Sequence, residues 1–205
     1  MQATVYSIGH STLSYEHFLN LLRQAGVTAV ADVRTSPYSR HFPHFGKDSL
    51  KNELQTDGIA YSFLGEELGG RPSDNRFYCE GVADYERMAK APAFEHGLKR
   101  VIDGAGRYTI ALMCSERDPL DCHRCLLIGR ALAERGLAMR HILGDGVVVD
   151  HAFIEEQLLK SEDRRDGDLF MSRKQRLEEA YRSRARKVAY VEKSQDDYRR
   201  SATGG

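Results

Sequence analysis

The strongest constraint on the fold of this chain is a fivefold alternation between apolar segments and segments with helical spacing. We interpret five segments as strands: "TVYSIGHST", whose strand ends at Gly9, "VTAVADVRT", "IAYSFLGEELGG" with its glycine-rich exit, "RYTIALMCSE" and "LAMRHILGDG". They show little polar–apolar alternation, which is typical of parallel strands that helices cover on both faces. The sequence therefore predicts an α/β domain with a mostly parallel, Rossmann-like sheet of five strands and helices on both faces.

Amphipathic segments connect the predicted strands. Over residues 14–26, apolar residues recur at helical spacing between Ser14, a candidate N-cap, and a closing glycine. A second strong helix is predicted over residues 121–136, where Asp121 is expected to be the cap and Cys122 falls in the first turn. Residues from about 65 to 82 show no such period and are expected to be irregular.

A change of character near residue 160 divides the chain. Residues 1–160 are predicted to form a single α/β domain, and residues 161–205 a C-terminal helical extension with a disordered end, "SATGG". The middle of this extension is amphipathic, with Leu177, Tyr181 and Val188 on one stripe of a helix. We expect this stripe to pack on the body of the protein or on a second chain, so it is a candidate homodimer interface.

Composition excludes several classes of protein. The chain carries no net charge, and residues 161–205 hold 12 Lys and Arg against 9 Asp and Glu, too small an excess to indicate nucleic-acid binding by charge alone. No segment has the length and apolarity of a membrane span, and the start "MQATVYSIGHS" is unlike an export signal. We therefore expect a cytoplasmic protein without a membrane partner. Its four cysteines indicate free thiols, ligands or reactive groups rather than a disulfide scaffold.

Polar and reactive side chains follow the predicted strands where each strand ends. Because the carboxyl ends of parallel strands meet at one edge of a sheet, these side chains are expected to lie close together. Any one of them alone fits an ordinary polar surface loop, and their shared edge is what indicates a site. The candidate catalytic residues are His10, Cys114 and Glu116, and the candidate substrate-binding residues are Ser11, Asp32, Arg34, Ser36, Arg40, Arg71, Cys122, His123 and Arg124.

Four segments also carry a family resemblance. "YSIGHSTLSYEHFLNLL", "AVADVRTSPYSRHFPHF", "LGGRP" and "CSERDPLDCHRCLL" resemble, in this order, the signature blocks of the domain of unknown function 488 family, over most of residues 4–150. The tail segment "LFMSRKQRLEEAYRSRARKVAY" is similar to a segment of longer members. The resemblance implies an α/β fold in which these blocks form one unit, and it implies no settled activity.

The cysteine-rich block "MCSERDPLDCHRCLL" has a metal interpretation. Cys122 and Cys125 form a C-x-x-C, with Cys114 and His123 close in sequence. A structural zinc site normally pairs two such spacings, and the chain has no second pair, so no cofactor is predicted. A metal bound through Cys114, Cys122 and His123 remains the alternative. Cys125 lies on an apolar helical stripe with Ile128 and is expected to be buried and inert.

The same block also has a nucleophile interpretation. A strand end or a helix start can lower the pKa of a thiol, so Cys114 and Cys122 are both candidate nucleophiles. A phosphatase-like or rhodanese-like loop is disfavoured because Leu120, rather than arginine, stands six residues after Cys114. Glu116 is a candidate general acid or base, or else the ion-pair partner of Arg34 or Arg124. Asp32 is expected to orient His10 or Arg34.

The arginines at the strand ends, together with free amides at the start of the predicted helix over residues 121–136, indicate a site for phosphate or carboxylate. Phe42 and Phe45 can stack on a base, although packing of their loop on the core is slightly favoured. The sequence therefore predicts a cytoplasmic enzyme, a hydrolase or transferase, that acts on a phosphate-bearing small molecule, a nucleotide or a nucleic acid. The alternatives are a non-catalytic nucleic-acid- or protein-binding module that uses the tail helix, and a thiol- or metal-dependent redox or sensor protein.

Overall fold

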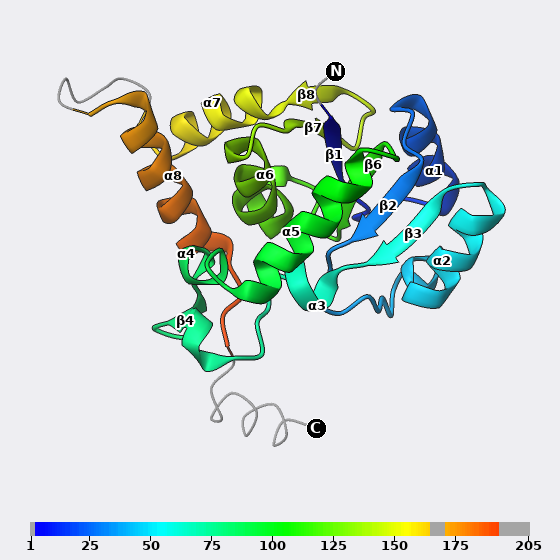
Figure 1. Cartoon of the computed structure of the whole chain (residues 1–205), viewed down its shortest axis with the longest axis horizontal. Coiled ribbons are helices and arrows are strands. Elements are labelled where there is room, and N and C mark those ends of the chain that lie inside the picture. Colours follow the sequence, from blue (N-terminus) through cyan, green and yellow to red (C-terminus); the bar gives the residue numbers. More distant parts are fainter. Residues whose placement is uncertain (1–2, 165–170, 193–205) are drawn as a thin grey trace.

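The computed structural model of the chain describes residues 3–164 and 171–192. Its main sheet has six strands in the order β3-β2-β6-β1-β7-β8 (Figure 1). The first five strands in this order run parallel, and β8 pairs antiparallel with β7. The bounds of the strands are β1 Thr4–Gly9, β2 Ala29–Asp32, β3 Ala60–Phe63, β6 Ile110–Cys114, β7 Ala138–Ile142 and β8 Val148–Asp150.

The five predicted strands are all present and parallel, but the predicted strand number is wrong because β8 is a sixth. β8 follows a tight turn in which Gly146 has a φ of +89°. A glycine-rich turn between two apolar runs is a hairpin signal, so "LGDGVVV" carried the information. The Rossmann-like arrangement is not confirmed. A Rossmann sheet places its first strand beside its second, whereas here β6 lies between β1 and β2.

Helices cover both faces of the main sheet (Figure 1). Ala111 and Met113 of β6 pack on the side of α1 and α2, whereas Leu112 and Cys114 pack on the opposite side. This alternation buries both faces of the central strand and explains why it reads as a continuous apolar run. The helices of the first face are α1 Tyr15–Gln24 and α2 Lys47–Thr56, and those of the second are α5 Pro92–Ala105, α6 Arg130–Glu134 and α7 His151–Ser161.

The segment that follows β6 differs from the prediction at its start. Cys122 has an extended backbone, and a π-helix over Arg124–Gly129 precedes α6. The predicted cap at Asp121 is wrong, because the side chain of Asp118 caps a short 3-10 turn instead. Asp121 forms an ion pair with Arg184. Cys122 therefore lies before the helix and not within its first turn.

The segment predicted to be irregular contains only short elements. They are α3 Gly65–Leu68, a 3-10 turn Asn75–Phe77 and the two-stranded sheet of β4 Tyr78–Cys79 and β5 Val82–Ala83, and α4 Tyr85–Met88 follows. Within the described residues, no helix combines the length and apolarity that a membrane span needs.

The tail helix α8, Arg173–Val188, packs along α7 (Figure 1). Leu177 and Tyr181 are buried, which confirms the predicted packing on the body of the protein. Beyond α8 the chain returns toward β5, where the amide of Ala83 donates to the carbonyl of Tyr190 at 2.9 Å. A homodimer through α8 and a domain boundary at residue 160 stay predictions, and the end predicted to be disordered lies outside the described residues.

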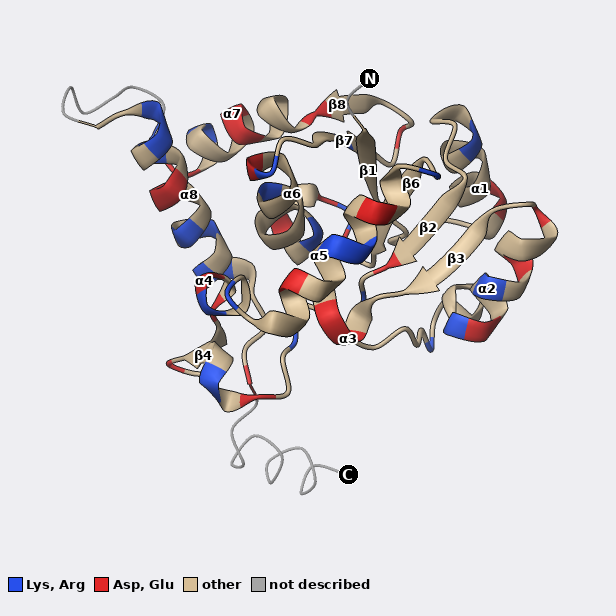
Figure 2. Ribbon diagram, in the orientation of Figure 1, with Lys and Arg blue, Asp and Glu red and all other residues tan. Residues whose placement is uncertain are grey.

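Figure 2 shows Lys and Arg residues along α8. Ion pairs bind several of them to the body of the protein. Their acidic partners lie on α4, on α7 and in the segments beside them. The pairs are Arg173 with Glu155 and Glu156, Arg182 with Glu86, Arg184 with Asp121, and Lys187 with Glu162. The charge of the tail therefore contributes to attaching α8.

Candidate functional site

A pocket of about 410 Å³ opens beyond the carboxyl ends of β2 and β6. Its walls come from five separate parts of the chain: the segment after β2, the end of β6 and the segment after it, the glycine-rich Gly70–Arg71, Tyr85 and the end of the tail. Cys114, Glu116, Cys122 and His123 all line it. This is the edge of the sheet where parallel α/β proteins bind ligands.

Four reactive side chains converge in this pocket. One donor atom from each of Cys114, Glu116, Cys122 and His123 lies within 4.8 Å of the others. His123 Nδ1 is 3.9 Å from Cys114 Sγ and 3.8 Å from Cys122 Sγ. Cys122 Sγ is 3.0 Å from Glu116 Oε2. The two thiols and the imidazole are buried, and Glu116 is half-buried. We call these four residues the thiol–imidazole cluster.

The orientation of His123 is set from both sides of its ring. Its Nε2 lies 2.9 Å from the carbonyl oxygen of Val33, which only accepts, so Nε2 carries a hydrogen. In the neutral ring, the lone pair of Nδ1 then points toward the two thiols. A Cβ at Gly70 would lie 2.7 Å from Nδ1, so the glycine allows its backbone to pack on the ring.

Burial and neighbouring charges shift the pKa values of the cluster. Burial raises the pKa of the Glu116 carboxyl, and the negative charge of Cys122 raises it further. Burial alone would raise the pKa of Cys122 too, but a hydrogen bond with Cys114 and the charges of Arg124 and His123 hold it well below its usual value. Burial raises the pKa of the Cys114 thiol. Cys122 is therefore the acid of the cluster that loses its proton most readily, whereas Cys114 and Glu116 hold theirs to a higher pH.

Arg124 holds the loop after β6 in place. Its guanidinium donates to the carbonyl oxygens of Glu116, at 2.6 Å, and of Arg117, at 3.0 Å. A Cβ at Gly9 would lie 1.9 Å from that Glu116 oxygen, so only glycine allows the end of β1 to approach the loop so closely. Arg124 is fully buried and is not among the residues that line the pocket. Its carbonyl contacts give it a positioning role.

The predicted anion site at the helix start is wrong in one respect. The amides of Cys125 and Leu126 donate to the carbonyl oxygen of Cys122, so these two are not free. The amide of Arg124 points at Cys122 Sγ, 3.4 Å away. That arrangement favours negative charge on the sulfur rather than on a bound phosphate.

Arg34 and Asp32 form a buried pair at the end of β2. The guanidinium binds both carboxylate oxygens, at 2.9 and 2.6 Å, which confirms that Asp32 orients Arg34. The Tyr61 hydroxyl also donates to Asp32, at 2.8 Å. Arg34 lines the pocket, whereas Asp32 does not. The carboxylate of Asp32 compensates the charge of Arg34.

His10 lies beside this pair and away from the pocket lining. Its Nε2 is 3.3 Å from a guanidinium nitrogen of Arg34, and its ring stacks on Phe45 with the centroids 4.2 Å apart. Burial and the charge of Arg34 lower the pKa of His10 to about 4. Phe45 is fully buried, so it packs its loop on the core as the favoured interpretation held.

The remaining predicted residues lie at the rim of the pocket or outside it. Ser36 and Arg71 line it, and both are exposed. The Arg71 guanidinium lies over the ring of Tyr190, 5.0 Å from its centroid. Ser11 donates its amide to the carbonyl of Ser115 and does not line the pocket. Arg40, exposed on its loop, does not line the pocket either.

Sequence reasoning missed the contribution of the tail to this pocket. Val188 and Tyr190 line it, and so does Tyr85 at the start of α4. The tail segment quoted above for its family resemblance contains Val188 and Tyr190, so that resemblance was a usable signal. Nothing in the local pattern around Tyr85 pointed to a site.

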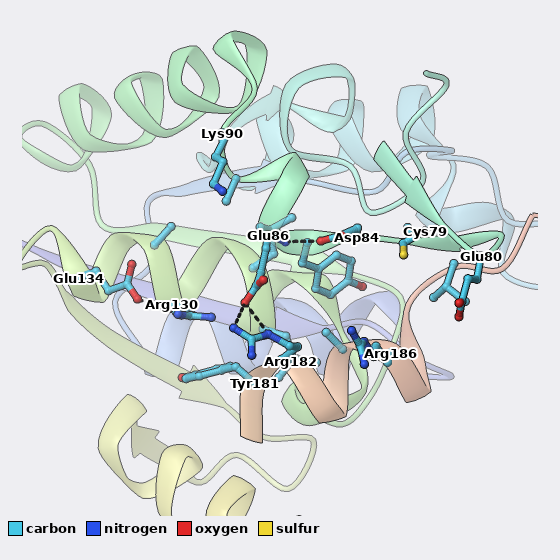
Figure 3. Close-up of a pocket in the computed structure, with 18 residues that line it drawn as sticks. Cys79, Glu80, Asp84, Glu86, Lys90, Arg130, Glu134, Tyr181, Arg182 and Arg186 are labelled. Atoms are coloured by element: carbon cyan, nitrogen blue, oxygen red, sulfur yellow. Dashed lines mark hydrogen bonds and ion pairs between the residues drawn. The ribbon is translucent and has the colours of Figure 1, made fainter. Parts of the chain in front are cut away.

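A larger hollow, of about 970 Å³, lies between α4, α6 and α8 (Figure 3). Two ion pairs lie among its charged side chains. Arg182 of α8 binds Glu86 of α4 at 3.0 Å, and Arg130 binds Glu134 within α6 at 2.9 Å. The first of these contacts connects two of the helices around the hollow.

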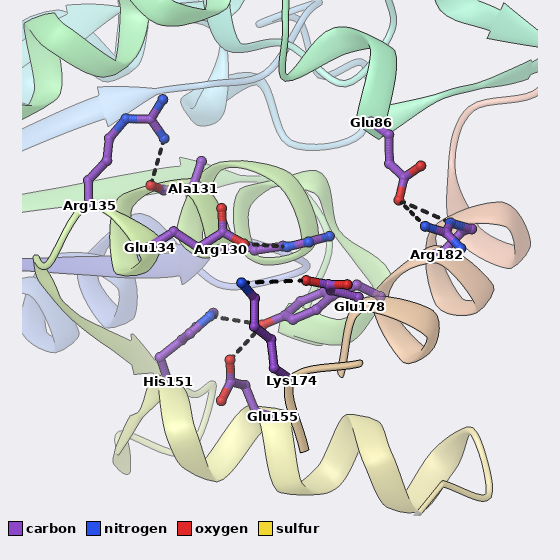
Figure 4. A network of polar contacts seen from close by, with 11 residues as sticks. Glu86, Arg130, Ala131, Glu134, Arg135, His151, Glu155, Lys174, Glu178 and Arg182 are labelled. Atoms are coloured by element: carbon purple, nitrogen blue, oxygen red, sulfur yellow. Dashed lines mark hydrogen bonds and ion pairs between the residues drawn. The ribbon is translucent and has the colours of Figure 1, made fainter. Parts of the chain in front are cut away.

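A second buried group of possible metal ligands consists of Cys125, His141 and His151. Here the ring nitrogens are already paired (Figure 4 marks one of the contacts of His151). His141 Nδ1 contacts the Ser7 hydroxyl at 2.8 Å, and its Nε2 contacts His151 Nδ1 at 2.9 Å. His151 Nε2 contacts the Tyr181 hydroxyl at 3.0 Å. This chain of hydrogen bonds connects the sheet to α8 and offers no free imidazole lone pair. Cys125 itself is fully buried, as expected.

Comparison with known proteins gives one match. The family model "Domain of unknown function DUF488" matches residues 14–131, which is more than half of the chain. The match covers α1, β2, the glycine-rich segment and the whole thiol–imidazole cluster. No curated protein and no solved structure matches the chain.

Proposed function

Because the chain belongs to the DUF488 family, whose function is unknown, its chemistry has to be inferred from the pocket, and we propose that it is an enzyme that acts there on a small phosphate-bearing substrate. The observation that carries this proposal is the convergence of two thiols, an imidazole and a carboxyl in one pocket. Perturbed ionisable groups lining a pocket are a mark of active sites.

The size of the pocket favours a small molecule as the substrate. About 410 Å³ lies within the usual range of ligand sites, and it suits a nucleotide or a sugar phosphate better than a nucleic-acid strand. Tyr85 and Tyr190 supply aromatic surface to its walls. The tail contributes one of these tyrosines, so substrate binding depends on the tail being in place.

Arg71 is the residue best placed to hold the phosphate. It is exposed, it lines the pocket, and its guanidinium rests on the Tyr190 ring and not on a carboxylate. Arg34 also lines the pocket, but Asp32 already binds its guanidinium. An arginine held over an aromatic ring keeps its donors available for bidentate contacts with phosphate.

Glu116 is the candidate general acid or base. Its carboxyl lies in the pocket, and its raised pKa brings proton transfer closer to neutral pH. A hydrolase or transferase needs such a group to protonate the leaving group or to deprotonate the attacking one. The two thiols and the imidazole of the cluster supply the remaining reactive atoms.

Ligand binding tests this proposal directly. Nucleoside mono- and diphosphates and sugar phosphates are screened by thermal shift, and hits are measured by calorimetry with the wild type and with Arg71→Ala. Loss of a charged hydrogen bond to phosphate should weaken binding by roughly 10- to 100-fold. Arg76→Ala is the matched control, because Arg76 is exposed and pairs with Asp74 away from the pocket.

The second step is turnover of the bound compounds. Release of inorganic phosphate or transfer of the phosphate-bearing group is followed for the wild type and for Glu116→Gln. We expect Glu116→Gln to bind the ligand but to turn it over at least ~100-fold more slowly, as for loss of a general acid or base. Equal binding by Arg71→Ala, or no phosphate compound bound at all, would overturn the proposal.

The tail helix gives little support to a nucleic-acid-binding module. Four of its basic residues are committed to ion pairs with the body of the protein, as described above. A backbone-binding surface needs cations that are free to replace counterions. A cytoplasmic location stays a prediction.

A further inference from the structure

The thiol–imidazole cluster has the donor set of a metal centre. We infer that Cys114 Sγ, Cys122 Sγ and His123 Nδ1 bind one zinc ion, with the fourth position facing Glu116 and the pocket. This inference deepens the proposed function, on which it rests for the placement of the reaction in this pocket.

The distances between the donor atoms fit a tetrahedral ion. Zinc–sulfur bonds of about 2.3 Å and zinc–nitrogen bonds of about 2.05 Å, at a tetrahedral angle, place sulfur and nitrogen roughly 3.6 Å apart. His123 Nδ1 is 3.9 Å from one sulfur and 3.8 Å from the other. Shifts of a few tenths of an ångström would therefore bring both sulfur–nitrogen distances to that value, and the three donor atoms already lie within 4.8 Å of one another.

The support around His123 is that of a metal ligand. A ligating imidazole normally donates its second nitrogen to a carbonyl or carboxylate, which fixes both the tautomer and the direction of the free lone pair. His123 Nε2 donates to the Val33 carbonyl at 2.9 Å, and the backbone of Gly70 packs on the ring. Nδ1 is thus presented to the two sulfurs before any ion arrives.

Charge balance favours a cation at this point. Two thiolates beside a carboxyl would place negative charge in a buried region. Asp32 compensates the charge of Arg34, and the single charge of Arg124, whose hydrogen bonds go to neutral carbonyl oxygens, offsets only one of the two thiolates. A divalent ion bound to two thiolates and a neutral imidazole leaves the centre neutral.

The other buried histidine group differs from the thiol–imidazole cluster in the nitrogens that it leaves for a metal. His141 and His151 also lie near a cysteine, but hydrogen bonds occupy both nitrogens of each ring. His123 has one nitrogen bonded to a carbonyl and one directed at sulfur. Of these two candidate groups among the described residues, only the thiol–imidazole cluster presents an imidazole with its second nitrogen aimed at thiols.

Zinc is the metal that this ligand set selects. Two sulfurs and one imidazole in tetrahedral geometry are typical of zinc, and three protein ligands with an open position are typical of catalytic zinc. A water in that position would lie beside Glu116, which is placed to accept its proton. The ligand spacing is C-x₇-C-H, which explains why a search for paired C-x-x-C spacings passes over it.

The test is metal binding by the full chain in the absence of substrate. The protein is purified under reducing conditions, equilibrated with zinc, and assayed for metal content by mass spectrometry. A parallel sample receives cobalt(II), which reports tetrahedral thiolate ligation by its visible and charge-transfer absorption. We expect one equivalent of zinc and a thiolate–cobalt spectrum. Less than a tenth of an equivalent of zinc, or octahedral cobalt, overturns the inference.

Matched variants assign the ligands. Cys114→Ser, Cys122→Ser and His123→Asn should each weaken zinc binding at least 100-fold, whereas Cys79→Ser, at an exposed cysteine outside the cluster, should not change it. Glu116→Gln should keep its zinc, because it faces the open position. Full retention of zinc by Cys122→Ser would contradict the assignment.

Chemical protection covers the case in which a ligand variant does not fold. In the wild type, zinc should protect Cys114 and Cys122 from alkylation at least 10-fold and leave exposed Cys79 unprotected, as read by peptide mass spectrometry. Absence of protection, or a Cys114–Cys122 disulfide that zinc and reductant do not replace, overturns the inference in favour of a redox role. Neither experiment uses a phosphate ligand, so failure of the zinc site leaves binding through Arg71 standing, and the reverse also holds.

Discussion

The imidazole of His123 donates to the backbone carbonyl of Val33 at 2.9 Å, which couples the residue after β2 to the residue before the π-helix. Val33 belongs to a strand end, whose position the sheet determines. The sheet therefore fixes the position of the ring, although His123 itself lies on a loop. This single contact directs the other ring nitrogen toward Cys114 and Cys122, and the predictions below begin with the residue that supports it from the opposite side.

Gly70→Ala should displace the His123 ring. The new Cβ would lie 2.7 Å from the ring atoms Cγ and Nδ1, closer than packed atoms approach. We expect a loss of about 1–3 kcal/mol in the free energy of unfolding, as for other overpacked sites, measured by urea denaturation. Gly106→Ala is the control, because its Cβ would meet its nearest atom at 3.6 Å. Equal stability of the two variants would show that the ring is not held from this side.

Asp32→Asn should destabilise the protein far more than an equivalent change at the surface. The variant keeps the size of the side chain but leaves the Arg34 guanidinium buried without its counter-charge. Removing one partner of a buried ion pair costs about 3–5 kcal/mol. Asp74→Asn removes the partner of exposed Arg76 and should leave the free energy of unfolding nearly unchanged. A cost for Asp32→Asn no larger than for Asp74→Asn contradicts the structural role given to the pair.

Stability should fall as the pH drops from about 6.5 to 4. Burial lowers the pKa of His151 to about 4 and that of His141 well below its usual value. At these two histidines the unfolded chain takes up protons in this range that the folded chain does not, so acid favours unfolding, and their contribution to stability is fully present above pH 6.5. The raised pKa values of Glu116 and His123 act in the opposite direction and offset part of the effect. The shift of His151 alone corresponds to about 3 kcal/mol. Urea midpoints across this range measure the effect.

His151→Asn is the variant that checks this assignment. It removes one of the buried titrating rings, so the loss of stability between pH 6.5 and 4 should become smaller, even though the variant starts less stable. His10, with a pKa of about 4, keeps part of the dependence in the variant. His17→Asn, at an exposed position, is the control. It should lose as much stability between pH 6.5 and 4 as the wild type does. If His151→Asn lost as much stability between pH 6.5 and 4 as the wild type, His151 would not contribute to the pH dependence.

The alternation of apolar and amphipathic segments was sufficient to predict the five parallel strands, because strands buried on both faces have a pattern of their own. Their order was not predictable in this way. The interposition of β6 between β1 and β2 depends on how crossovers pack, and local sequence does not encode it. β8 was predictable in principle from its turn, but the sequence analysis assigned no strand to its three residues.

The candidate site was predictable as a set of residues, and its internal roles were not. Strand ends placed Cys114, Glu116 and Arg34 near one another by topology alone. Which groups face the pocket depends on tertiary contacts, and these turned Arg124 toward two carbonyls and His10 toward Phe45. Helix propensity suggested a start at Asp121, but the extended backbone of Cys122 overrides it and directs the thiol at Glu116.

A chain that ends at residue 160 should aggregate or lose thermal stability. Removing α8 exposes the apolar surface that Leu177 and Ala180 cover, and it breaks the hydrogen bond between Tyr181 and His151. It also removes Val188 and Tyr190 from the pocket, so the affinity for a phosphate ligand should fall together with stability.

A chain that ends at Glu192 keeps the contacts described for α8 and serves as the control. Size-exclusion chromatography, thermal midpoints and calorimetry compare the two with the full chain. If the shorter chain matched the full chain in all three measurements, α8 would be a dispensable appendage. If the shorter chain lost only ligand affinity, the tail would complete the pocket without stabilising the fold. The two outcomes are distinguishable because the residues that line the pocket differ from those that cover α7.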